Sequence, residues 1–348
     1  MNLRIRACGG VLIVLCLFFA CSSCLHAPPK KKKLLAINTW PWTNATFAAF
    51  KTLVAGGTSV DAVEAGCRKC EDMQCDGTVG FGGSPDSTGE VTLDAMILDG
   101  SSHDMGAVGC LRNVRHAISV ARSVMEHTSH SLLVGDKATS FAVMAGFSQE
   151  PLETDRSNLL HAAWLANHCQ PNFFRGFPGD KSACPPYPPA TAMREHARQQ
   201  ANSHVSRTNH DTIGVIALDA DGNMAVGTST NGASHKIAGR VGDAAIVGAG
   251  GYVDKDVGAA AATGDGDLMM RFLPAHRAVS NMRGGMTPGE ACEEALEAIA
   301  KVHPSFQGAM ICVSAQGAHG GAAHGWRFEY SFQEDDMTAP EIVEVVPT

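Results

Sequence analysis

The chain has 348 residues, of which 45% are hydrophobic and 18% are charged. That apolar fraction is enough for a packed core and excludes wholesale disorder, and the length allows one large domain or two medium ones. The formal charge of −8 argues against a general nucleic-acid-binding protein.

Residues 1–24 have the three-part pattern of a secretory signal peptide. Arg4 and Arg6 form a basic start, residues 11–20 are an unbroken apolar run, and a patch of small residues follows. A run this short cannot cross a bilayer, which needs about 20 residues, so we expect cleavage rather than anchoring. A bacterial lipoprotein signal that uses Cys21 is a less favoured alternative. No later apolar run approaches spanning length, and we expect no membrane attachment after signal removal.

Two further features agree with a secretory route. Eight of the 12 cysteines lie beyond residue 24, and an even number in a secreted chain indicates disulfide bonds. Cys67 and Cys70 have the spacing of a zinc or redox motif, but no matching second pair exists, so we interpret them as structural. The only N-glycosylation sequon begins at Asn44 and predicts a glycan there if the organism is eukaryotic.

Hydrophobic periodicity and capping residues predict the regular elements. Those of the first half are a strand at 34–38, helices at 44–55 and 60–71 capped by Thr43 and Ser59, a strand at 91–98, and helices at 114–127 and 155–168. Those of the second half are strands at 213–218 and 224–230, a helix from Pro288 to about Lys301, and strands at 309–314 and 327–332. Asp221-Gly222 is a hairpin signal, and Thr287 and Glu290 form a capping box. This order indicates a layered α+β body.

A segment of different composition, about residues 176–211, separates the two halves. Six of the 16 prolines lie at 171–189, and residues 190–210 have almost no large apolar side chains. Such a stretch cannot bury enough surface to offset its ordering entropy, so we predict an exposed linker.

Thr212 follows the linker directly and is a candidate nucleophile. A threonine hydroxyl within a chain has no attached base. If the bond between Asp211 and Thr212 were cut, the new α-amine, with an ordinary pKa of about 7.7–8.0, could accept the hydroxyl proton. Nucleophile and base would then belong to one residue. An Asp-Thr pair is by itself a weak signal, because most such pairs are helix caps or strand starts.

The motifs around this junction resemble the glycosylasparaginases (aspartylglucosaminidases), which are N-terminal-nucleophile hydrolases of the asparaginase type. Each motif is short, but the ordered set is specific, and the resemblance extends over most of residues 34–314. The motifs are NTWP at 38–41, DGTVGFGGSPD at 76–86, TLDAM at 92–96, GAVG at 106–109, HDTIG at 210–214, GTSTNG at 227–232, GRVGD at 239–243 and ATGDGD at 262–267.

The resemblance implies a fold, an activation step and an activity. The fold would be a four-layered αββα sandwich. The precursor would cleave itself before Thr212 into an α subunit of residues 25–211 and a β subunit of residues 212–348, which together form one folded domain. The enzyme would hydrolyse the bond between N-acetylglucosamine and the asparagine side chain of GlcNAc-asparagine, with no metal and no cofactor. It would be a dimer of αβ units in the lysosome, or in the periplasm or medium if bacterial.

The resemblance also implies the catalytic groups. The Thr212 hydroxyl would attack the side-chain amide and form a β-aspartyl ester. Thr230 would hydrogen-bond near the nucleophile, and the Thr263 hydroxyl and Gly264 N–H would form an oxyanion hole. A residue-based alternative for Thr230 is a strand position chosen for β propensity, and residues 262–267 could be a plain turn.

Substrate-binding roles come from the same resemblance. Arg240 would bind the substrate α-carboxylate with its guanidinium fork, and Asp243 would bind the α-ammonium. Gly266 would let the backbone approach the ligand, and Trp40 would lie beside the sugar and the amide. Without the family, Arg240 and Asp243 suggest a surface ion pair, and Trp40 suggests a core residue.

The family pattern implies three disulfides, namely Cys70–Cys75, Cys169–Cys184 and Cys292–Cys312. Cys67 and Cys110 would then be free thiols, plausible as buried groups. Animal members carry one more cysteine pair near the C-terminus, but no cysteine follows Cys312. That fourth bridge should be missing here.

Two sequence patterns resemble metal-binding motifs, but we do not interpret either as a metal site. Residues 219–223 begin like a calcium loop, but Met224 replaces the turn glycine, so we interpret them as a hairpin. His127 and His130 are interpreted as solvated side chains.

Two other functions remain open at this stage. One is a β-aspartyl peptidase or L-asparaginase of the same family, against which Trp40 and the Thr230-Asn231-Gly232 segment favour the glycosylated substrate. The other is a non-catalytic secreted binding protein, which the intact Asp-Thr junction, Arg240 and Asp243 together disfavour.

Overall fold

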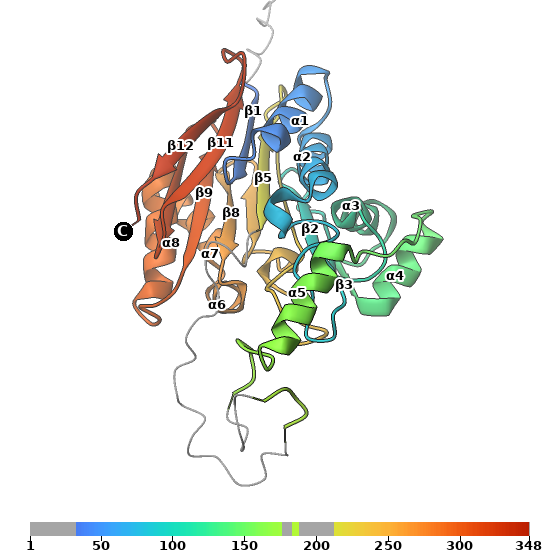
Figure 1. The fold of residues 1–348 in the computed structure, drawn as a ribbon. Coiled ribbons are helices and arrows are strands. Elements are labelled where there is room, and N and C mark those ends of the chain that lie inside the picture. The colour runs from blue at the N-terminus through green and yellow to red at the C-terminus, as the bar shows by residue number, and fades with distance from the viewer. Residues whose placement is uncertain (1–32, 176–182, 188–211, 348) are drawn as a thin grey trace, which may run out of the picture. The chain divides into compact units, whose positions relative to one another are not determined.

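The computed structural model describes residues 33–175, 183–187 and 212–347. These residues form eight α-helices and twelve β-strands, so the fold is mixed α and β, as expected (Figure 1). The predicted signal peptide and residues 176–182 and 188–211 of the predicted linker, Asp211 among them, lie outside the described residues.

Eight strands form the larger sheet, in the order β12-β11-β1-β5-β6-β2-β3-β4. Its neighbouring strands are antiparallel, except for the parallel pair β3 and β4. Its strands are β1 Leu35–Thr39, β2 Leu93–Asp99, β3 Met105–Leu111, β4 Leu132–Val134, β5 Ile213–Leu218, β6 Met224–Thr230, β11 Phe328–Glu334 and β12 Glu341–Val345.

Four antiparallel strands form the smaller sheet, in the order β10-β9-β8-β7. They are β7 Gly251–Asp254, β8 Gly258–Gly264, β9 Gly308–Ser314 and β10 His319–His324. The helices are α1 Thr43–Val54, α2 Ser59–Met73, α3 Ala117–His127, α4 Gly135–Met144, α5 Asp155–Ala166, α6 Gly266–Phe272, α7 Pro274–Arg283 and α8 Pro288–Ala300. None of these eight helices has both the length and the apolar character that spanning a bilayer requires.

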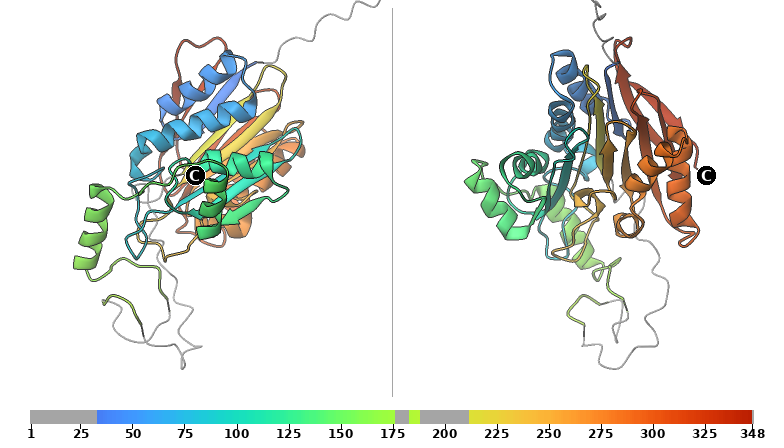
Figure 2. Two further views of the ribbon diagram at one scale, coloured as in Figure 1. Left: turned by 90° about the vertical axis from the view of Figure 1, so that its right-hand side faces the viewer. Right: turned by 180° about the vertical axis from the view of Figure 1, so that it is seen from behind.

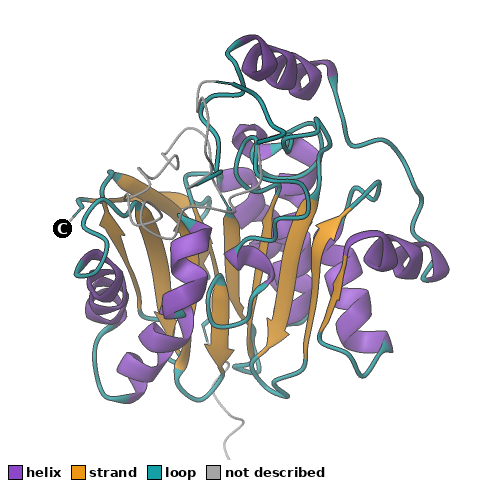
Figure 3. Ribbon diagram, turned by 90° about the horizontal axis from the view of Figure 1, so that it is seen from below, coloured by secondary structure: helices purple, strands orange, loops and turns teal. Residues whose placement is uncertain are grey.

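Three apolar cores set the stacking of these elements. The first lies between α1–α3 and the larger sheet, and includes Phe50, Val63 and Ile118. The second lies between the two sheets and includes Ile37, Val226 and Ile311. The third joins the smaller sheet to α7 and α8. Helices therefore lie on both outer sides of the paired sheets (Figures 2 and 3).

Capping chemistry explains the best-predicted helix and corrects two other predictions. The Thr287 hydroxyl accepts from Glu290 N–H at the start of α8, as the capping box predicted. At α2, however, Thr58 is the N-cap and forms a capping box with Asp61, so the prediction of Ser59 was wrong by one residue. At α1 the N-cap is Trp42, which makes no side-chain cap, and Thr43 is already helical.

Several elements were not predicted. They are β3, β4, α4, β7, β8, α6, α7, β10 and β12. The clearest case is β8, whose sequence GAAAATG has little intrinsic strand preference. Its seven residues are buried between the larger sheet and α7, so tertiary packing decides their conformation. Residues 262–264 end this strand and α6 begins at Gly266, so the plain-turn interpretation of 262–267 was wrong.

The structure contains the three disulfides Cys70–Cys75, Cys169–Cys184 and Cys292–Cys312. Cys67 and Cys110 are free, the first buried and the second partly buried. The pairing that the family pattern implied is therefore confirmed.

Candidate active site

Thr212 leads directly into β5 and is held by its backbone. Its N–H donates to Thr263 Oγ1 (3.1 Å), and its carbonyl accepts from Thr39 Oγ1 (2.8 Å). Thr39 Oγ1 also accepts from Gly214 N–H (2.8 Å). Thr212 is fully buried, and its own Oγ1 has no hydrogen-bond partner among the described residues. The backbone of Thr212 is therefore fixed by hydrogen bonds, whereas no described group engages its hydroxyl.

Thr230 closes the next strand beside it. The antiparallel register pairs Ile213 with Ser229, so one step further along the ladder places Thr212 opposite Thr230. Thr230 Oγ1 accepts from Gly232 N–H (2.9 Å) and donates to the Thr78 carbonyl (3.4 Å). Two threonine hydroxyls therefore lie at one end of the larger sheet.

Thr263, at the end of β8, brings the smaller sheet to this point. Its Oγ1 accepts from Thr212 N–H (3.1 Å) and from Trp40 Nε1–H (3.2 Å). A hydroxyl oxygen has two lone pairs and one proton. With both lone pairs accepting, the Thr263 proton is left to donate elsewhere in the site.

Gly264 follows in a conformation that only glycine adopts readily. Its φ is +130°, and an added Cβ would lie 2.5 Å from Gly308 Cα. The absence of a side chain keeps the backbone beside Thr263 in place.

Asp243 is buried and Arg240 is largely buried, so the surface-ion-pair interpretation was wrong. The Arg240 side chain is 11% exposed and its Nη2 lies 3.1 Å from Asp267 Oδ2. Asp243 is 1% exposed, and neither of its carboxylate oxygens has a hydrogen-bond partner among the described residues. A buried carboxylate of this kind is costly unless a ligand compensates it.

A glycine lets these two charged groups approach the backbone closely. A Cβ on Gly266 would lie 2.2 Å from Asp243 Oδ1 and 3.2 Å from Arg240 Nη2. The guanidinium and the carboxylate therefore both lie against Gly266, with the two atoms no more than about 5.4 Å apart. A group with both an anionic and a cationic end, such as the α-carbon end of an amino acid, matches this arrangement of charges.

Burial dominates the electrostatics of the pair. It raises the pKa of Asp243 to about 7, against the lowering effect of Arg240. Burial also lowers the pKa of Arg240, but the carboxylates of Asp267, Asp94 and Asp243 outweigh it, so that this pKa is raised overall. Arg240 is charged at any working pH, whereas Asp243 titrates near neutrality.

Trp40 occupies a strained and buried position. Its φ is +78°, its side chain is 3% exposed, and its ring packs near Trp42, Trp326 and Phe328. This packing agrees with the interpretation of Trp40 as a core residue. In addition, its indole N–H donates a hydrogen bond to Thr263 Oγ1. Strain of this kind is often stored at functional sites.

Asn231 is a site residue to which the sequence assigned no role of its own. Its Nδ2 donates to the Gly80 carbonyl (3.1 Å), its Oδ1 accepts from Ser84 N–H (3.2 Å), and its own N–H donates to the Thr78 carbonyl (2.8 Å). These bonds join the motif at 227–232 to the motif at 76–86. The sequence offered one signal for this contact, namely that both segments belong to the ordered set of motifs.

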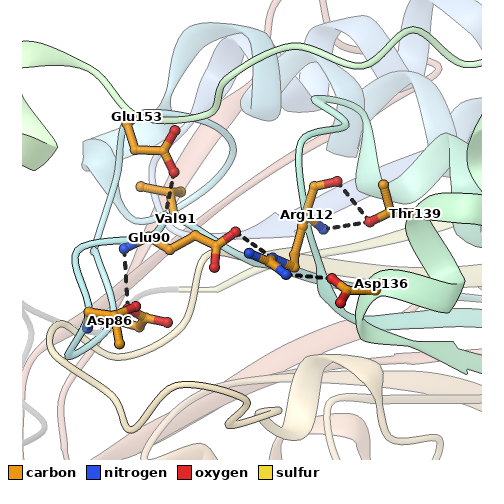
Figure 4. A network of polar contacts seen from close by, with 8 residues as sticks. Asp86, Glu90, Val91, Arg112, Asp136, Thr139 and Glu153 are labelled. Carbon is orange, nitrogen blue, oxygen red and sulfur yellow. Dashed lines mark hydrogen bonds and ion pairs between the residues drawn. The ribbon is translucent and has the colours of Figure 1, made fainter.

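A polar network braces the segment that follows this contact (Figure 4). Arg112 forms ion pairs with Glu90 and Asp136, and its backbone N–H donates to Thr139 Oγ1 (3.1 Å). Asp86 Oδ1 accepts from Glu90 N–H (3.2 Å). The network ties the turn at 86–90 to α4.

The other predicted positions lie away from the site. Asn44 is exposed in the first turn of α1, accessible to a glycan. Asp219 Oδ1 accepts from Asp221 and Asn223 N–H, closing the predicted hairpin between β5 and β6. His127 and His130 are exposed. In the described part of the chain, no group of three His, Cys, Asp or Glu residues is arranged to hold a metal ion.

Comparison with known proteins agrees with this geometry. A family model described as Asparaginase matches residues 11–338. The N(4)-(beta-N-acetylglucosaminyl)-L-asparaginases of Rattus norvegicus and Mus musculus are each 53% identical to this chain over 291 residues. Each match covers 83% of this chain and 84% of the relative.

Proposed function

This chain belongs to the asparaginase family, and we propose on that premise that it hydrolyses the bond between N-acetylglucosamine and an asparagine side chain. One observation carries the proposal: the Asp243 carboxylate, which has no hydrogen-bond partner among the described residues, and the Arg240 guanidinium both lie against Gly266. That pair fits the α-ammonium and α-carboxylate of a free asparagine. That the asparagine side chain carries N-acetylglucosamine is inferred from the names of the two relatives.

Maturation is the first chemical step of the proposal. Thr212 Oγ1 attacks the Asp211 carbonyl carbon, the peptide C–N bond breaks, and the Thr212 nitrogen takes up a proton. Water then hydrolyses the ester and regenerates the hydroxyl. The products are an α chain that ends at Asp211 and a β chain that begins with Thr212. The free Thr212 hydroxyl and its held carbonyl support this step.

Catalysis uses the same hydroxyl. The new α-amine accepts the Thr212 hydroxyl proton, and Oγ1 attacks the side-chain amide carbon of the substrate. The Thr263 proton and Gly264 N–H stabilise the oxyanion. This role of Thr263 is supported by the two hydrogen bonds that its Oγ1 accepts, which leave its proton free to donate. The C–N bond breaks, the sugar amine leaves with the proton, and a β-aspartyl ester remains. Water hydrolyses that ester to aspartate, with Thr230 beside the nucleophile.

Substrate binding divides between two charged groups. Arg240 binds the α-carboxylate and Asp243 binds the α-ammonium, and Gly266, against which both groups lie, lets the backbone approach the ligand. Because both ends must be free, the proposal predicts action on GlcNAc-asparagine rather than on asparagine within a peptide. Trp40 lies on the Thr263 side, where the amide would sit.

The proposal extends to architecture and location. The order of the three cores supports a four-layered αββα sandwich. Residues 31–348 cluster into one compact unit, and β5 of the β subunit lies between β1 of the α subunit and β6, which supports one folded domain made of residues 25–211 and 212–348. We further propose a dimer of αβ units, delivered to the lysosome by the signal peptide and a glycan on the exposed Asn44, with periplasm or medium as the bacterial equivalent.

Two measurements test the proposal. N-terminal sequencing of the smaller band on a reducing gel should read Thr-Ile-Gly-Val, and Thr212→Ala should stay uncut. The purified enzyme should hydrolyse GlcNAc-asparagine faster than a β-aspartyl dipeptide. Faster dipeptide turnover would assign it to the peptidase and L-asparaginase branch. An uncut wild-type chain that still binds aspartate would indicate a non-catalytic binding protein.

A further inference from the structure

Lys236 is buried beside the candidate site without a role in the proposed chemistry. It is 1% exposed and is among the largest fully buried side chains of the protein. Its Nζ donates to two backbone carbonyls, those of Asn231 and Thr92, the second at 3.2 Å. Within the described residues, both acceptors are neutral, so the ammonium has no carboxylate hydrogen-bonded to it.

The acidic side chains nearest to this charge are already engaged elsewhere. Asp94 Oδ1 accepts from Cys110 N–H (2.7 Å) and its Oδ2 accepts from Gly242 N–H (2.8 Å). Asp86 Oδ1 accepts from the backbone and the hydroxyl of Thr88. They attract Lys236 only at a distance, and burial still lowers its pKa. An incompletely compensated buried cation is costly to fold.

The Lys236 ammonium lies near the Arg240 guanidinium, on the same side of Gly232. An added Cβ there would lie 3.2 Å from Lys236 Nζ and 3.0 Å from Arg240 Nη1. The two cationic groups therefore flank one side of a turn in which φ is +75°, and they lie no more than about 6 Å apart. Like charges this close repel each other, and an anion bound between or beside them would relieve that repulsion.

We propose that Lys236 is a specificity-determining residue: its buried ammonium adds a second positive charge to the Arg240 subsite and selects ligands that carry a free α-carboxylate. This inference rests on the proposed function, because the ligand is the amino acid end of its substrate. Lys236 acts through its field and through the turn that it holds at Asn231 and Gly232. Direct contact with the carboxylate belongs to Arg240.

The test compares two ligands that differ only at the α-carboxylate. L-aspartate carries the free carboxylate, and its α-amide, L-isoasparagine, has a neutral carboxamide in place of that group. Their dissociation constants are measured by calorimetry on the mature wild-type enzyme and on Lys236→Gln, whose amide retains hydrogen-bond donors for the two carbonyls. Lys51→Gln, at an exposed lysine on α1, is the matched control.

The expected result is a loss of selectivity. Lys236→Gln should weaken aspartate binding about tenfold, as expected for one partly screened charge at this range, and should change α-amide binding little. KM for GlcNAc-asparagine should rise by a similar factor, with kcat nearly unchanged. Equal loss for both ligands would overturn the proposal, because a residue that only supports the turn would weaken both alike.

A second variant keeps the inference testable if Lys236→Gln does not mature. Arg240→Gln removes the guanidinium but leaves the Lys236 charge in place, so a residual preference of at least about fivefold for aspartate over its α-amide is expected. Complete loss of that preference would overturn the inference. If the wild-type enzyme binds aspartate in this Lys236-dependent way but does not cleave GlcNAc-asparagine, the proposed function fails and the inference stands.

Discussion

The indole Nε1 of Trp40 lies 3.2 Å from Thr263 Oγ1 and donates a hydrogen bond to it. The two residues come from the end of β1, in the larger sheet, and from β8, in the smaller one. Because Thr212 N–H occupies the second lone pair of the same oxygen, this contact orients the Thr263 hydroxyl proton. A residue 223 positions away in the sequence thus sets the direction of a donor in the candidate oxyanion hole.

Trp40→Phe tests this orientation directly. The variant keeps an aromatic ring in the core but loses the N–H donor, so the Thr263 hydroxyl gains freedom to rotate. We expect kcat for GlcNAc-asparagine to fall about 10–100-fold, within the range for an impaired oxyanion donor, with KM changed little. The measurement is steady-state kinetics on cleaved enzyme. Trp164→Phe, in an aromatic stack on α5 with His235, is the matched control and should keep kcat within about twofold. Unchanged kcat in Trp40→Phe would contradict the orienting role.

Gly266→Ala tests the close packing of Asp243 and Arg240 against Gly266. The new Cβ would lie 2.2 Å from Asp243 Oδ1, closer than any real contact, so it would displace the carboxylate that is proposed to bind the substrate ammonium. We expect KM to rise at least tenfold, while cleavage at Thr212 proceeds. Gly289→Ala in α8, where a Cβ meets nothing within 4 Å, is the control and should behave as wild type. Normal KM in Gly266→Ala would place the amino acid end elsewhere.

The pH dependence of ligand binding should follow Asp243. Because burial raises the pKa of this carboxyl to about 7, it is charged above that pH and neutral below it. Affinity for L-aspartate should therefore fall as the pH decreases from 8 to 6, by up to about tenfold per unit below the pKa. Succinate, which lacks the ammonium, should not lose affinity in this way. Equal pH dependence for the two ligands would exclude Asp243 as the ammonium partner.

Stability should depend on pH through Glu71 in α2. Its Oε1 accepts from Ser229 Oγ (2.6 Å) and Ile118 N–H (3.0 Å), and burial raises its pKa from 4.5 to about 8. Between these two pH values the folded chain retains a proton that the unfolded chain releases. The free energy of unfolding therefore decreases as the pH rises through this window.

Glu71→Gln removes that titration and keeps the acceptor oxygen. Relative to its parent, it should gain roughly 1–4 kcal/mol of stability on going from pH 5 to pH 8. Denaturant unfolding in a Thr212→Ala background keeps both proteins as single chains, and Glu297→Gln at an exposed site on α8 is the control. A difference between Glu71→Gln and its parent that does not change with pH would show that Glu71 is ionised in the folded chain.

Local chemistry accounts for the elements that were predicted well. Helix α8 was predicted because Thr287, Pro288 and Glu290 carry a complete start signal within four residues. The hairpin of β5 and β6 was predicted because Asp221-Gly222 separates two apolar runs. By contrast, β8 has an alanine-rich sequence without a period, and only its burial between two layers makes it a strand.

The sequence by itself determined the residue types, the Asp211-Thr212 junction and, through the ordered motifs, the family, the disulfide pairs and the groups that belong to one site. The tertiary structure alone decided how those groups face each other. The hydrogen bond from Trp40 orients the Thr263 hydroxyl. The Asp243 carboxylate has no hydrogen-bond partner within the described residues. Lys236 and Arg240 lie on one side of Gly232. The physical reason is that these contacts join segments far apart in the chain. Sheet register and layer packing bring them together, and no local pattern of residues encodes either.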